Sequence, residues 1–151
     1  MRIVVCVKHV PDMQSERRFE GGRLVRGEDD VLNELDENAI EAAVQLKESE
    51  EDAGREAEVV ALTMGPEDAE DSLMRALQMG ADRAYIVSDE FLEGSDVITT
   101  ASVLAVAIAK ISEECGPVDL VITGMASLDA MTSMLPGALA AKAHMPLLGL
   151  A

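Results

Sequence analysis

The stretch RIVVCVK, residues 2–8, decides the expected fold, because its apolar residues are consecutive rather than alternating. This pattern is typical of a strand that is covered on both faces, as strands are inside a parallel sheet. Similar runs follow at AEVVALT (57–63), RAYIV (83–87) and VDLVIT (118–123), and a fifth is MPLLGLA (145–151). The sequence therefore predicts five strands of one sheet.

Between these runs, apolar residues recur with a helical period over 37–50, 67–79 and 96–111. Ser95 and Asp96 are suited to cap the third of these helices, because their side-chain oxygens can accept hydrogen bonds from the free amides of the first turn. Strands and helices alternate, and right-handed crossovers then place helices on both faces of the sheet. We predict a doubly wound, mostly parallel five-stranded α/β sheet of the Rossmann-like class, formed by residues 1–151 as a single domain.

The composition argues against several kinds of partner. The chain has 151 residues, 48% of them hydrophobic, and a formal net charge of −17. Such a charge repels nucleic acids and anionic membranes, and the sequence has no Trp for stacking on bases. No signal segment opens the chain and no apolar run reaches about 18 residues. We therefore expect a soluble, cytoplasmic protein that binds neither nucleic acid nor membrane.

The charge is distributed unevenly along the chain. Residues 1–26 hold six basic and three acidic side chains, a net charge of +3 that leaves −20 on the rest. This segment is suited to receive an anion, although a solvated loop would have the same composition. The two cysteines, Cys6 and Cys115, lack the spacing of a metal or redox pair, so both are expected to be reduced structural thiols.

One connection is unusually long. More than twenty residues separate Lys8 from the helix expected near 33–37, whereas such loops usually take roughly 2 to 6 residues. Ligands of open parallel sheets settle beyond the carboxyl ends of the strands, where neighbouring connections leave in opposite directions. If the first strand is central and 118–123 is its neighbour, the long loop and the turn after Gly124 face one crevice. Lys8 and His9 could meet a phosphate there or only close the sheet.

The turn that follows the fourth strand ends in Pro136, which limits where the next helix begins. Proline costs about 3 kcal/mol inside a helix but is tolerated in the first turn, so the helix should begin no earlier than about Ser133. Thr132 or Ser133 is then expected at the N-cap. Their hydroxyls and the free amides of the helix could hold a phosphate, or the hydroxyls could only cap the helix.

Other side chains of this turn suggest further contacts. Asp129 could accept hydrogen bonds from ribose hydroxyls, and Met125, Met131 and Met134 could form an adaptable apolar wall. No nucleophile and base are spaced for catalysis. The sequence therefore indicates a binding subunit, with no catalytic residues, rather than a self-contained enzyme.

Four motifs resemble the β subunit of electron transfer flavoproteins, in matching order and spacing. They are VVCVKHVPD (4–12), LNELDENAIEAAVQLKE (32–48), MGP (64–66) and LMRALQMGADRAYIV (73–87). The segment 124–146 occupies the place of that family's nucleotide loop. The resemblance covers essentially all of the chain, and RALQMGADRA is its most specific part.

The resemblance implies an adenine nucleotide α-hydrolase-like sheet that binds AMP as a structural cofactor, or FAD in the electron-bifurcating branch. It also implies a heterodimer with an FAD-carrying α subunit, which shuttles electrons from flavin dehydrogenases to an acceptor. Carried over by motif, the cofactor-binding residues would be Cys6, Asn33, Glu34, Leu35, Asp36, Met64, Gly124, Met125, Ala126, Ser127, Leu128, Asp129, Thr132 and Ser133.

This chain departs from the family's pattern in the nucleotide loop and in length. Ala130 and Met131 stand where the family has Asp or Gly before the Thr, and Met134 stands where it has Gln. The family's chains are longer, and their second half supplies a flavin-facing surface and a docking loop. Two alternatives remain open: a stand-alone ATP- or AMP-binding regulator similar to universal stress proteins, and an interaction module whose nucleotide site is lost.

Overall fold

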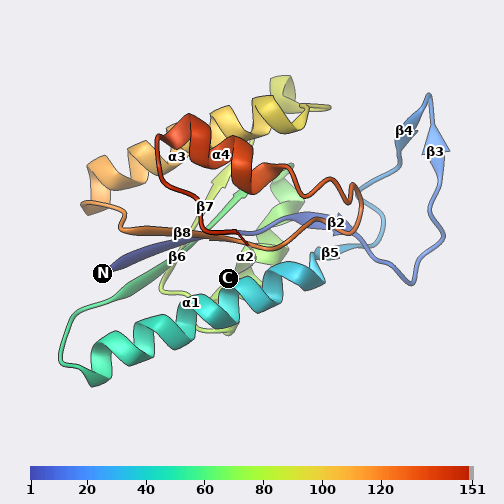
Figure 1. The fold of residues 1–151 in the computed structure, drawn as a ribbon. Coiled ribbons are helices and arrows are strands. Elements are labelled where there is room, and N and C mark those ends of the chain that lie inside the picture. Colours follow the sequence, from blue (N-terminus) through green and yellow to red (C-terminus); the bar gives the residue numbers. More distant parts are fainter. Residues whose placement is uncertain (150–151) are drawn as a thin grey trace.

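The computed structural model describes residues 1–149 and contains a sheet of four parallel strands in the order β7-β6-β1-β8 (Figure 1). These strands are β1 (Arg2–Cys6), β6 (Glu58–Met64), β7 (Arg83–Val87) and β8 (Leu120–Thr123). Each coincides, to within two residues at either end, with a run that the sequence predicts as a strand. The predicted parallel sheet is confirmed, with four strands in place of five.

The fifth predicted strand is wrong over the residues that can be compared. Residues 145–149 adopt no strand, and residues 150–151 of that prediction lie outside the described residues. A strand must pair its backbone amides with a neighbour, and Pro146 has no amide to offer. Leu147 and Leu148 are 56% and 82% exposed. Apolar content alone therefore does not bring this segment into the sheet.

Helices cover both faces of the sheet (Figure 1). One face carries α1 (Glu34–Asp52) and α2 (Glu70–Gln78), which the 3-10 turn η1 (Glu67–Ala69) precedes, and the other carries α3 (Val97–Cys115) and α4 (Leu135–Ala143). The two faces follow from the alternation of side chains along a strand. In β1, Ile3 and Val5 pack with α1 and α2, whereas Val4 and Cys6 pack with α3 and α4. The doubly wound arrangement is confirmed.

Local signals fix several boundaries of these helices. The carboxylate of Asp96 caps α3 as predicted, accepting the Thr99 amide at 2.7 Å. Gly80 follows α2 with a φ of 117°, a conformation that favours glycine. Cys6 and Cys115 are free thiols, as predicted. None of the helices within residues 1–149 has the length and apolar character needed to cross a membrane.

The long connection after Lys8 forms two small antiparallel ladders. The first joins β2 (His9–Pro11) to β5 (Asp30–Leu32), and the second joins β3 (Phe19–Glu20) to β4 (Arg23–Leu24) in a hairpin that projects from the body (Figure 1). His9 is buried, and its Nδ1 lies 2.8 Å from Oγ of Ser72 on α2. His9 therefore anchors the start of the loop to the body.

Ile40 tests how α1 packs on the sheet, because its side chain is fully buried in the cluster that joins the two. We expect Ile40→Ala to lower the free energy of unfolding by about 2 to 5 kcal/mol, since it removes buried methyl groups and leaves a cavity. Leu46→Ala, at a side chain of α1 that is 41% exposed, is the matched control and should cost about 1 kcal/mol or less. Urea unfolding measures both, and equal losses would contradict this packing.

Candidate functional site

The carboxyl ends of β1 and β8 meet where the chain reverses its direction of winding. The two strands are parallel neighbours, with Cys6 opposite Thr123. The chain passes from β1 to α1 on one face of the sheet and from β8 to α4 on the other. Ligands of open α/β sheets bind at such a switch point. The central position of β1 and its pairing with β8 fulfil the condition under which the long loop and the turn after Gly124 face one crevice.

Asn33 ties the start of α1 to the turn after β8. Its side chain is fully buried, its Nδ2 donates to the Ala126 carbonyl at 2.9 Å, and its Oδ1 accepts from the Leu128 amide at 3.0 Å. Its backbone amide donates to the Lys8 carbonyl at 2.9 Å. Asn33 stands at the N-cap of α1 but makes no side-chain cap bond. The group that could cap the helix instead fixes the distant turn.

Asp36 and Gly124 fit together beside this link. Asp36 is buried, and its Oδ2 accepts the Lys8 amide at 2.8 Å. A Cβ at residue 124 would lie 2.1 Å from Oδ1 of Asp36 and 3.1 Å from the Leu35 carbonyl oxygen, so only glycine lets the turn approach α1 this closely. Burial raises the pKa of Asp36 from 3.8 to about 6, against the lowering effect of the hydrogen bonds that it accepts.

Cys6 and Met64 end two neighbouring strands and pack on the side of α3 and α4. Cys6 is 5% exposed, and its burial, together with the nearby carboxylate of Asp36, raises the pKa of its thiol to about 12. The thiol is therefore neutral at physiological pH. A neutral buried thiol suits an apolar packing contact and not a nucleophile.

Asp129 joins the turn to the long loop. Its side chain is fully buried and accepts hydrogen bonds from Lys8 Nζ at 2.9 and 3.0 Å and from the Arg26 guanidinium. Burial alone would raise the pKa of this carboxyl, but the hydrogen bonds from Arg26 and Lys8 outweigh burial and hold the pKa well below its usual range. Arg17 also reaches the turn, donating to the Leu128 carbonyl at 3.1 Å.

Each of the six basic side chains in residues 1–26 has an acceptor within the chain. Besides the contacts of Lys8, Arg17 and Arg26, Arg2 pairs with Glu58, Arg18 with Glu28 and Arg23 with Glu93. The basic segment therefore fastens the loop to itself and to the body. Neither interpretation of the sequence, an anion receiver or a solvated loop, included this use.

The end of the turn differs from the prediction. α4 begins at Leu135 with Met134 at the N-cap and no side-chain cap bond, so neither Thr132 nor Ser133 caps the helix. Ser133 adopts a φ of 49°, whereas a capping residue needs an extended backbone. Thr132 and Ser133 are exposed, directly before the first turn of α4. The limit set by Pro136, a helix that begins no earlier than about Ser133, is confirmed.

Three methionines stand on the outside of the same turn. Met125, Met131 and Met134 are 57%, 62% and 53% exposed. Their unbranched, polarizable side chains can adapt to an apolar surface. All three side chains are therefore open to solvent, and the apolar wall stays a prediction.

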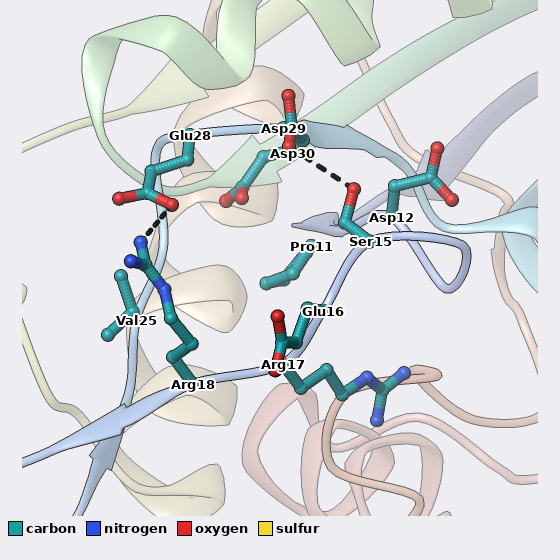
Figure 2. Close-up of a pocket in the computed structure, with 10 residues that line it drawn as sticks. All are labelled: Pro11, Asp12, Ser15, Glu16, Arg17, Arg18, Val25, Glu28, Asp29 and Asp30. Carbon is teal, nitrogen blue, oxygen red and sulfur yellow. Dashed lines mark hydrogen bonds and ion pairs between the residues drawn. The ribbon is translucent and has the colours of Figure 1, made fainter.

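Two hollows lie near the long loop. One, of about 30 Å³, is bordered by the Arg18–Glu28 ion pair and by the hydrogen bond from Ser15 to Asp29, and it has room for about one water molecule (Figure 2). The other, of about 810 Å³, is an open groove between β5, the start of α1 and α2, and Glu34 and Leu35 line it. Neither hollow is lined by residues of β1 or β8.

These contacts sort the predicted site residues into three groups. One group comes together at the switch point: Cys6, Asn33, Leu35, Asp36 and the turn from Gly124 to Asp129. Met64 ends the neighbouring strand β6, and Glu34, Thr132 and Ser133 are exposed at the margin. The sequence interpretation missed the pairing of Lys8 and Arg26 with Asp129. The sequence feature that could have indicated this pairing is the gathering of basic residues in an unusually long loop. No three His, Cys, Asp or Glu side chains among the described residues are placed to hold a metal ion.

Gly124 allows a direct test of the close approach between the turn and α1. We expect Gly124→Ala to lower the free energy of unfolding by about 1 to 3 kcal/mol, because the added methyl group overlaps Asp36. Gly137→Ala is the matched control: residue 137 lies within α4, its Cβ would have free space, and alanine should stabilise the helix by about 0.5 to 1 kcal/mol. Urea unfolding measures the stability of both variants, and equal effects would contradict the close contact between the turn and α1.

The raised pKa of Asp36 makes stability depend on pH with a definite sign. The folded chain keeps the Asp36 proton up to about pH 6 and the unfolded chain only to about pH 3.8, so the stability from this group is present below pH 3.8 and lost as the pH rises to 6. We expect this loss to reach about 3 kcal/mol of unfolding free energy and to be absent in Asp36→Asn. Unfolding of both proteins at intervals from about pH 4 to 7 measures it, and parallel profiles would contradict it.

Comparison with known proteins confirms the resemblance that the motifs indicate. Residues 22–150 match the model of the electron transfer flavoprotein domain. The chain is 41% identical over 140 residues to the protein FixA of Azorhizobium caulinodans, covering 91% of this chain and 48% of that protein. It is 40% identical over 147 residues to the electron transfer flavoprotein subunit beta of Mycobacterium tuberculosis, covering 95% of this chain and 54% of that protein.

A third relative is the caffeyl-CoA reductase-Etf complex subunit CarD of Acetobacterium woodii, 38% identical over 148 residues, which cover 97% of this chain and 53% of that protein. The chain thus spans about half the length of the relatives it matches. By name, one relative is a subunit of an electron transfer flavoprotein, one is a subunit of a caffeyl-CoA reductase-Etf complex, and one is FixA. The chain therefore belongs to the electron transfer flavoprotein family, in which its relatives include β subunits and FixA proteins.

Proposed function

We propose that this chain is the nucleotide-binding part of an electron transfer flavoprotein β subunit. Residues 1–151 would form one domain that binds AMP as a structural cofactor, or FAD in a bifurcating complex. The observation that carries the proposal is the switch point beyond β1 and β8, where buried Asn33 and Asp36 hold the turn after Gly124 against α1. Membership of the family supports the same function.

In this proposal two walls contact the nucleotide. Cys6, Met64 and residues 33–36 form the wall of strand ends and α1, and the second wall is the turn of Gly124, Met125, Ala126, Ser127, Leu128 and Asp129. The neutral thiol of Cys6 and the thioether of Met64 suit the apolar faces of an adenine ring. These two side chains support the proposal that the base of an adenine nucleotide lies against this wall.

The phosphate is proposed to meet Thr132 and Ser133. Both hydroxyls are exposed directly before α4, and the first amides of a helix have no partners within it. A helix start also carries a partial positive charge, which favours a phosphate. Thus hydroxyl donors and free amides stand together at one end of the turn, although the hydroxyls do not cap the helix.

Bound AMP would supply no redox chemistry, whereas FAD would accept and donate electrons. The chain's own residues would bind and orient either group. No nucleophile is paired with a base at the switch point, since the Cys6 thiol is neutral and Asp129 is held by Lys8 and Arg26. We therefore propose an electron-transfer subunit and not a self-contained enzyme.

The names of the relatives support a partner subunit, because a subunit beta and a complex subunit belong to assemblies. We propose an FAD-carrying α subunit as the partner in a heterodimer, with flavin dehydrogenases as electron donors. Since the chain spans about half the length of its relatives, electron transfer itself is proposed for the complete assembly.

Extraction of the purified protein with acid, followed by identification of the released compound, tests the proposal. Stoichiometric AMP or FAD is the expected result. Release of ATP would favour a regulator similar to universal stress proteins, and an empty protein that also binds no added AMP or FAD would favour an interaction module. Either of these two results would contradict the proposal.

A double variant tests the role of the two hydroxyls. We expect Thr132→Ala with Ser133→Ala to weaken nucleotide binding by about 1 to 3 kcal/mol, because phosphate oxygens lose their donors. Thr99→Ala with Ser102→Ala, at two positions on α3, is the matched control and should leave binding unchanged. Isothermal titration measures both affinities. Unchanged affinity in the first variant would remove Thr132 and Ser133 from the site.

A further inference from the structure

One buried carboxylate at the switch point is held by two cations from different segments. The Asp129 side chain has no exposed surface, while those of Lys8 and Arg26 are 40% and 41% exposed. Lys8 follows β1, Asp129 lies in the turn after β8, and Arg26 belongs to the long loop. The two ion pairs of Asp129 therefore join the three segments that surround the proposed nucleotide.

The charges of this cluster do not balance. Two cations face one carboxylate, so the cluster carries a net charge of about +1 in a chain whose formal net charge is −17. A phosphate group carries up to two negative charges and has three acceptor oxygens, whereas a carboxylate has one charge and two oxygens. Arginine and lysine are the side chains that most often bind phosphate. A phosphate would therefore satisfy these cations more fully than Asp129 does.

Hydrogen bonds also fix part of this cluster, as a binding site requires. The Lys8 backbone is fixed by its amide bond to Asp36 Oδ2 at 2.8 Å and by its carbonyl, which accepts from Asn33 at 2.9 Å. Oγ of Ser127 lies 3.4 Å from Lys8 Nζ and adds a hydroxyl to the same place. Arg26 comes from irregular backbone beside Gly27, whose φ is 82°. One cation thus stands on backbone that two hydrogen bonds hold, and the other stands on irregular backbone of the long loop.

We propose that Lys8 and Arg26 form a phosphate-binding pair and that Asp129 occupies this pair as an internal substitute when no phosphate is bound. This inference rests on the proposed function and adds to it a second group of phosphate ligands. Binding of the nucleotide exchanges one anion for another: the phosphate takes the two cations, and the Asp129 carboxylate leaves them while its backbone stays in the wall of the site. The internal carboxylate weakens binding, because the phosphate must displace it.

Inorganic phosphate tests this pair without a nucleotide. Binding to the wild type and to Asp129→Asn is measured by NMR titration of backbone amides. We expect Asp129→Asn to bind phosphate at least about 10-fold more tightly, since its two cations lose their internal anion. Arg26→Gln should bind it about 10-fold more weakly than the wild type. Arg18→Gln, in the same loop but paired with Glu28, is the matched control and should bind as the wild type does.

Titration with AMP and with adenosine links the pair to the nucleotide. Asp129→Asn should tighten binding of AMP and leave that of adenosine unchanged. Weaker binding of both ligands would overturn the proposal, because it would mean that the carboxylate contacts the ribose. Unchanged phosphate affinity in Asp129→Asn would overturn it as well. Phosphate binding of the expected kind without AMP or FAD binding would instead support the pair and contradict the proposed function.

Asp129→Asn leaves two cations close together, so this variant could lose its fold. Thermal unfolding detects that outcome separately. If Asp129→Asn does not fold, Lys8→Gln and Arg26→Gln provide the test, because each leaves the carboxylate one partner. Both should weaken phosphate binding about 10-fold relative to Arg18→Gln. Equal phosphate affinity in all three proteins would overturn the proposal.

Discussion

One buried side-chain amide holds the two walls of the proposed site together. The Asn33 side chain donates a hydrogen bond to the Ala126 carbonyl and accepts one from the Leu128 amide, so both of its polar atoms bind the same turn. Its backbone amide donates to the Lys8 carbonyl. A buried amide that loses such partners costs about 1 to 3 kcal/mol, so the turn has one favoured position relative to α1. The close approach of Asp36 and Gly124 joins the same two segments beside this link.

The electrostatics of this end of the sheet depend on that position. The chain is strongly acidic, and an unpaired anion would be repelled from most of its surface. Lys8 and Arg26 make this end of the sheet locally attractive to an anion. Asp129 contacts both cations because the turn is held against α1. The two carboxyls of the site then differ in pKa for physical reasons. Burial raises the pKa of Asp36 despite the amide hydrogen bonds that it accepts, whereas the two cations that contact Asp129 hold its pKa below the usual range.

The sequence predicts the sheet well because the signal of a strand covered on both faces is local and strong. β7 is predicted to the residue, and the order of strands and helices follows from alternation and handedness. The prediction of a fifth strand is wrong because strand pairing depends on a neighbour, which a run of apolar residues does not specify. The prediction of the helix N-cap is wrong for a similar reason. Pro136 limits the start of α4, but the backbone of Ser133, which decides the N-cap, depends on how the whole turn is held.

Most of the candidate site could be named from motifs, but its contacts could not be derived. The side chains of Lys8 and Asp129 are 121 residues apart in the sequence, and the hydrogen bonds of Asn33 span 93 and 95 residues. Spacing signals reach only a few residues, so they place groups on elements and not against each other. The length and charge of the long loop distinguish it in the sequence, yet its partners depend on the sheet order that brings β8 beside β1.

The turn combines a rigid part with an adaptable part, and this division fits the binding of a ligand. Residues 124–129 are held by Asn33, Asp36, Lys8 and Arg26. Residues 131–134 are exposed, and Met131 and Ser133 adopt φ values of 51° and 49°, a region that costs a residue with a Cβ about 1 kcal/mol or more. Strained backbone of this kind clusters at ligand-binding sites and switch regions. The two strained residues, Met131 and Ser133, flank Thr132, so the part of the turn that the chain itself stabilises least is the part proposed to meet the phosphate.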